Sequence, residues 1–131
     1  MEHFRQTNLW LVTAGALMTL TVFIHIFAGG PEVLAPTRTS DLDPVVISVL
    51  SVIWHGVTWI LTLIAVTLFY AARQGSVGLI ILVSVIQIGF AVLFLAYGLI
   101  DLGTLWPMPQ WVIFLTIPAL SLIGILRERT L

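Results

Sequence analysis

The chain contains no cysteine and no lysine, and it carries little charge of either sign. Its 131 residues include five basic and six acidic side chains, which gives a formal net charge of −1. Without cysteine the chain cannot form a disulfide, a thiolate metal site or a cysteine nucleophile. Without a cluster of basic residues it lacks the surface that nucleic acid or anionic lipid headgroups require. We therefore expect no nucleic-acid partner.

Apolar residues take the place of the missing charge. They make up 60% of the chain against 8% charged residues, and the mean hydropathy is +1.14. In a soluble domain about a quarter of the residues are charged, which covers the surface and keeps the protein in solution. The composition therefore predicts an integral membrane protein in contact with the lipid bilayer.

Four apolar stretches have lengths near the roughly 20 residues that a helix needs to cross a bilayer. The predicted spans are residues 9–28, 44–72, 77–100 and 109–126. Gly29-Gly30-Pro31 predicts the end of the first span, since two flexible glycines precede a residue without an amide proton. Asp43-Pro44 predicts the start of the second, because an N-cap acid followed by proline is typical of a helix start. Residues 29–43 then form an outer loop.

No internal repeat or linker divides the chain, so we predict one domain over residues 1–131. The fold class is all-α: four transmembrane helices in an up-down antiparallel bundle. The arginines predict its orientation, because positive charge is retained on the cytoplasmic side. Arg38 falls on one side of this arrangement, and the other four fall opposite it: Arg5, Arg73, Arg127 and Arg129. Both termini are therefore expected in the cytoplasm, with the chain in a bacterial inner (plasma) membrane.

Two histidines, His25 and His55, lie inside the first two predicted spans. An ionisable side chain within a bilayer costs a few kcal/mol or more unless it is paired, hydrated or liganded. Taking Trp10 and Tyr70 as aromatics of the inner interface, each histidine is 15 residues from one of them. Both then lie about 22 Å from that interface. We expect them at similar depth, near the edge of the outer leaflet.

Polar residues accompany His55 at steps of three and four along the second span: Ser48, Ser51, Thr58 and Thr62. This spacing places them on a single stripe of the helix. Small and hydroxyl-bearing residues allow membrane helices to pack closely, so the serines and threonines predict a packing seam. For the histidines this explanation is weaker, because serine or threonine would serve the same purpose at a lower desolvation cost.

One functional hypothesis is a haem b site with a role in electron transfer. His25 and His55 would be the axial ligands on facing helices, and Tyr97 and Trp111, expected at the same depth, would line the site beside the macrocycle. A second is a divalent transition-metal site with the same two histidines. Oxygen ligands would come from acids on the outer side: Glu32 and Asp101. A third is a proton or quinone site, where a histidine titrates near neutrality.

Two further interpretations need no cofactor. In one, the histidines are structural and hydrogen-bonded to neighbouring hydroxyls or carbonyls. In the other, the protein is a non-catalytic accessory or scaffolding subunit of a larger membrane complex, or a homo-oligomer, held together by small-residue seams. The sequence has no Ser-His-Asp spacing, phosphate-binding glycine loop or H-E-x-x-H motif, which argues against a hydrolase or an ATP-driven machine and leaves other enzymatic activity open.

Overall fold

The structure is a computed structural model that describes residues 7–128, and every regular element in that range is a helix. The elements are α1 (Leu9–Ile24), the π-helix η1 (His25–Leu34), α2 (Ala35–Arg38), α3 (Pro44–Gln74), α4 (Val77–Leu102) and α5 (Trp111–Glu128). Three continuous helices are long and apolar enough to cross a membrane: Leu9–Arg38, Pro44–Gln74 and Val77–Leu102. A shorter apolar helix follows over Trp111–Arg127. These features agree with the predicted helical membrane protein.

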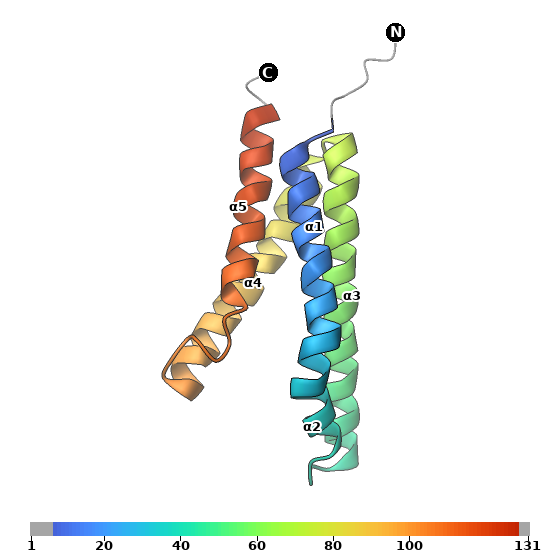
Figure 1. Cartoon of the computed structure of the whole chain (residues 1–131), viewed down its shortest axis with the longest axis vertical. Coiled ribbons are helices and arrows are strands. Elements are labelled where there is room, and N and C mark those ends of the chain that lie inside the picture. Colours follow the sequence, from blue (N-terminus) through green and yellow to red (C-terminus); the bar gives the residue numbers. More distant parts are fainter. Residues whose placement is uncertain (1–6, 129–131) are drawn as a thin grey trace.

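The helices form two antiparallel hairpins, α1 with α3 and α4 with α5, as Figure 1 shows. Helix α1 also packs on α5, and α3 meets α4 through the short turn at Gly75 and Ser76. Within the described chain no Cα atom of α1 lies within 8 Å of α4, nor one of α3 within 8 Å of α5. Each long helix therefore has two neighbours, an arrangement compatible with an up-down bundle.

The two hairpins pack together at only one end, which we call the core end. The described chain starts and finishes there, and the hairpins diverge toward the opposite end (Figure 1). Buried side chains of α1 and α3 all belong to this end, from Leu11 to Met18 and from Leu61 to Ala72. No residue from 19 to 60 is buried. We call this part of the α1–α3 hairpin the distal arm.

Asn8 ties three helices together at the core end. Its side-chain oxygen accepts hydrogen bonds from the backbone N–H groups of Trp10 and Leu11, which caps α1. Its Nδ2 donates to the Gly124 carbonyl in α5 at 2.9 Å, and its backbone N–H donates to the Ala72 carbonyl in α3 at 2.9 Å. One residue therefore sets the relative positions of α1, α3 and α5.

The first helix does not end at Gly29, as the Gly-Gly-Pro run had predicted. It continues as η1 to Leu34 and as α2 to Arg38, so the predicted outer loop over residues 29–43 is reduced to a turn at 39–43. In an α-helix, the Pro31 ring would clash with the carbonyl of Phe27. Here the residues around Pro31 form a wider π-helix in place of an α-helix, and the helix continues through the proline.

The other helix ends lie near the predicted positions. The Asp43 carboxylate accepts a hydrogen bond from the Val45 N–H at 2.8 Å, so it caps α3 where Pro44 begins it. Gly75 ends α3 in the left-handed conformation, with φ of 65°, which glycine adopts without strain. Helix α5 begins at Trp111, two residues after the predicted 109. Arg5 and Arg129, two of the arginines used for orientation, lie outside the described residues.

Candidate functional site

His25 lies where α1 becomes η1, and it contacts Trp54 of α3 in two ways. Its imidazole stacks on the indole with ring centroids 4.1 Å apart and planes inclined by 15°. Its Nε2 lies 3.4 Å from the Trp54 carbonyl oxygen. A carbonyl only accepts hydrogen bonds, so this contact uses the tautomer with its proton on Nε2. His25 is thereby a polar tie between the first helix and α3.

Gly29 also packs against the Trp54 indole. A Cβ atom built on Gly29 would lie 2.9 Å from Cη2 of Trp54, closer than real Cβ atoms approach their neighbours. On Gly30, the next residue, a Cβ would meet nothing within 4 Å. The first glycine of the Gly-Gly-Pro run is therefore required for close approach of η1 to α3. Trp54 was missed as a site residue, although its position beside His55 and the spacing of His25 and Gly29 are visible in the sequence.

His55 directly follows Trp54, the residue that contacts His25, so the two predicted histidines lie at about the same level of the α1–α3 hairpin. Their environments differ, however. His25 is half-buried under Trp54, whereas His55 is exposed. No hydrogen bond to the His55 imidazole is present within residues 7–128. One histidine is therefore occupied by protein contacts, while the other presents a donor and an acceptor to its surroundings.

His55 shares a surface depression with three residues that follow it along α3. Together with Thr58, Trp59 and Thr62 it lines a shallow surface depression, which we call the His55 surface. The hydroxyl of Thr58 donates to the Trp54 carbonyl at 3.1 Å, and that of Thr62 donates to the Thr58 carbonyl at 2.8 Å. Their protons are therefore used within the helix, and each oxygen keeps lone pairs that can accept a further hydrogen bond.

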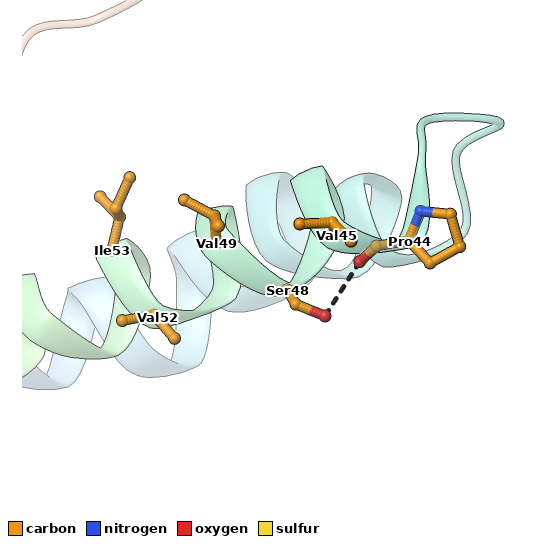
Figure 2. Close-up of a pocket in the computed structure, with 6 residues that line it drawn as sticks. All are labelled: Pro44, Val45, Ser48, Val49, Val52 and Ile53. Carbon is orange, nitrogen blue, oxygen red and sulfur yellow. Dashed lines mark hydrogen bonds between the residues drawn. The ribbon is translucent and has the colours of Figure 1, made fainter.

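A second surface depression lies nearer the start of α3 and is almost entirely apolar (Figure 2). The six residues that line it are Pro44, Val45, Ser48, Val49, Val52 and Ile53. Its one hydroxyl, on Ser48, donates to the Pro44 carbonyl at 2.9 Å, drawn as the dashed line in Figure 2. All six residues come from one helix, so this is an open apolar flank of the distal arm.

The aromatic and acidic residues predicted to complete the site lie apart from the histidines. Tyr97 and Asp101 are at the far end of α4, where the hairpins have diverged (Figure 1). Trp111 begins α5 beside Trp106, with ring centroids 6.4 Å apart. The segment that carries His25, η1, contacts α1, α2 and α3 and neither α4 nor α5.

Glu32 is on η1 itself and is exposed. Over the described residues, no group of three histidine, aspartate, glutamate or cysteine side chains is close enough to hold one metal ion. The structure thus places the two histidines at one level of the α1–α3 hairpin and separates them from the predicted aromatic lining and from Asp101. The reason is the divergence of the hairpins, which an even four-helix bundle would not have.

Comparison of the chain with protein-family models, with curated proteins and with solved structures finds no match.

Proposed function

We propose that this protein is a non-catalytic membrane subunit that assembles with a second transmembrane chain through its distal arm. The observation that carries this proposal is the exposed His55 imidazole, which has no hydrogen bond within the described residues. His55 is 11 residues inside the 31-residue helix α3, about 16 Å from its start at Pro44. With α3 across a bilayer, this imidazole lies in hydrocarbon, where an unpaired polar group is costly.

The distal arm adds support. It contains no buried residue, and large apolar side chains are exposed along both of its helices. Lipid tails cover such side chains at no cost, because the tails are equally apolar. They provide no hydrogen bond to an imidazole. A polar group on another protein provides one, which favours a protein partner over lipid alone at this position.

The proposal includes a topology. All four apolar helices cross a bacterial inner (plasma) membrane, with the core end in the cytoplasm. Among the described arginines, Arg73 and Arg127 lie at the core end, and Arg38 lies at the opposite end. That opposite end also carries four acids: Glu32, Asp41, Asp43 and Asp101. Retention of positive charge on the cytoplasmic side favours this orientation.

Haem or metal binding by His25 and His55, with a role in electron transfer, is a second candidate. The position of His55 next to Trp54, which contacts His25, favours it. Bis-histidine ligation of haem b places the macrocycle between the two rings, whereas the His25 ring is stacked on Trp54 of the adjacent helix. Binding of a metal by His25 would also break the contact between its Nε2 and the Trp54 carbonyl, or it would use Nδ1 in place of Nε2. Assembly through His55 needs no such rearrangement and is the function that we favour.

The test compares the wild type with His55→Leu after extraction from native membranes in a mild detergent. Light scattering on a size-exclusion column reports the protein mass of each complex. We expect the wild type to run as a complex heavier than the 14.4 kDa chain and His55→Leu to shift toward the monomer at the same protein concentration. Ile53→Leu, an exposed apolar change two residues away on the other flank of α3, is the matched control and should behave as the wild type. A monomeric wild type, or a complex that His55→Leu leaves intact, would overturn the proposal.

A further inference from the structure

We infer that the chain bound at the His55 surface is a second copy of this protein, so that two α3 helices pack side by side around a two-fold axis normal to the membrane. This inference rests on the proposed function and names the partner at that surface. It follows from the hydrogen-bonding groups, the depth and the position of the four residues His55, Thr58, Trp59 and Thr62.

The His55 surface is complementary to itself. A neutral imidazole offers one N–H donor and one nitrogen acceptor. The Thr58 and Thr62 oxygens offer acceptors, because their protons already go to carbonyls of their own helix. In a symmetric pair, the His55 N–H of one copy has two acceptors within reach: the nitrogen of the other imidazole and, about one helical turn away, the Thr58 oxygen. Each copy thus supplies what the other lacks.

In a second copy of the chain, the polar residues lie at the same depth in the membrane as those of the first. All copies of one chain insert in the same orientation, and a two-fold axis normal to the membrane places each residue opposite its own equivalent. A different protein would need a polar residue at the same depth as His55, about 16 Å from the start of α3. For a second copy, the sequence of α3 already provides this match.

The surface is also free to pack without disturbing the core. Leu61 is on the buried face of α3, and His55 and Thr62 lie about 100° around the helix from it. Trp59 is 69% exposed and flanks the depression, so it offers apolar area to a partner beside the hydrogen-bonding groups. The small hydroxyl residues Thr58 and Thr62 suit close contact of two membrane helices.

Disulfide trapping tests the inference directly, since the chain has no cysteine of its own. Thr62→Cys places one thiol on the His55 surface. Ile60→Cys is the matched control: it is two residues away, exposed, and on the opposite flank of α3. Each purified full-length variant is reconstituted in phosphatidylcholine vesicles at low protein density and oxidised with copper phenanthroline. A disulfide forms only where the two Cα atoms approach within about 7 Å.

We expect a disulfide-linked dimer from Thr62→Cys and at most a trace from Ile60→Cys. Adding His55→Leu to Thr62→Cys should weaken dimerisation about 3- to 20-fold, the range for loss of one interhelical hydrogen bond in a membrane. Equal crosslinking at both positions would overturn the inference. If Thr62→Cys forms no dimer while a heavier complex is still present in native membranes, the partner is not a second copy and the proposed function stands. No dimer and a monomer in native membranes would overturn both.

Discussion

The His25 imidazole is held by a single residue of the neighbouring helix, Trp54, which contacts it through both its side chain and its backbone. The indole covers the ring at a centroid distance of 4.1 Å, and the Trp54 carbonyl oxygen lies 3.4 Å from Nε2. These contacts join η1 to α3 within the distal arm, where no residue is buried. They give the arm a defined pairing that apolar contacts alone do not specify, and they leave the adjacent His55 as the histidine available to a partner.

The two glycines of the Gly-Gly-Pro run are expected to differ in their tolerance of alanine. Gly29→Ala should lower the free energy of unfolding by about 1–3 kcal/mol, because the new Cβ would lie 2.9 Å from the Trp54 indole and overpack the contact. Gly30→Ala should be neutral or slightly stabilising, since its Cβ would meet nothing within 4 Å. Reversible unfolding in detergent, followed by circular dichroism, measures both variants. Equal stability of the two would contradict the packing of Gly29 against Trp54.

Asn8 is expected to stabilise the core end through its side chain. Asn8→Ala removes the cap of α1 and the hydrogen bond to the Gly124 carbonyl, and it should cost about 1–3 kcal/mol of unfolding free energy. Asn8→Ser keeps a side-chain oxygen for the cap and loses the donor to Gly124, so it should lie between the wild type and Asn8→Ala. The same unfolding measurement ranks the three proteins. A serine variant no better than alanine would show that the cap contributes nothing.

The haem or metal hypothesis makes its own prediction. A haem b held by His25 and His55 should give a Soret band and reduced haem bands, and either His25→Ala or His55→Ala should abolish them. A bound divalent metal should give stoichiometric metal in elemental analysis without those bands. The measurement is a visible spectrum, oxidised and reduced, with metal analysis of the same purified sample. A folded preparation that is colourless and metal-free when isolated from native membranes, without chelator, would contradict this second candidate.

The proposed topology predicts which turns face the cytoplasm. Ser40→Cys lies in the turn between α2 and α3, and Ser76→Cys lies in the turn between α3 and α4 at the core end. In intact spheroplasts, a membrane-impermeant maleimide should label Ser40→Cys at once. It should label Ser76→Cys only after the membrane is permeabilised. The reverse pattern would place the core end outside, against the distribution of arginine.

Much of the local structure follows from short stretches of the sequence. The composition predicts membrane helices, and the Asp43-Pro44 pair starts α3 where expected. The helix ends at Gln74, before Gly75, two residues beyond the predicted end at residue 72. The alignment of His25 with His55 was also expected, from residue counts along two helices joined by a short turn. Each of these inferences depends on neighbours in sequence or on the constant rise of a helix.

The path of the first helix and the divergence of the hairpins did not follow from the sequence. Gly-Gly-Pro predicts a helix end, yet a π turn carries the helix through Pro31 to Arg38. Tyr97, Asp101 and Trp111 were expected beside the histidines, and the tertiary structure places them with the other hairpin. Nothing in the helical spacing of these residues distinguishes the two arrangements.

The physical reason lies in the membrane-like composition itself. In a soluble helix, polar and apolar faces show which side is buried. In α3, Leu68 is buried and Leu63 is exposed, yet both are leucine. Lipid and protein interior accept leucine equally well, so the residue type does not show which side of the helix is buried. The sequence therefore determined that the chain forms apolar helices and which polar residues they carry. Only the tertiary structure decided which helices pack together. That packing places Trp54 against His25 and leaves His55 exposed.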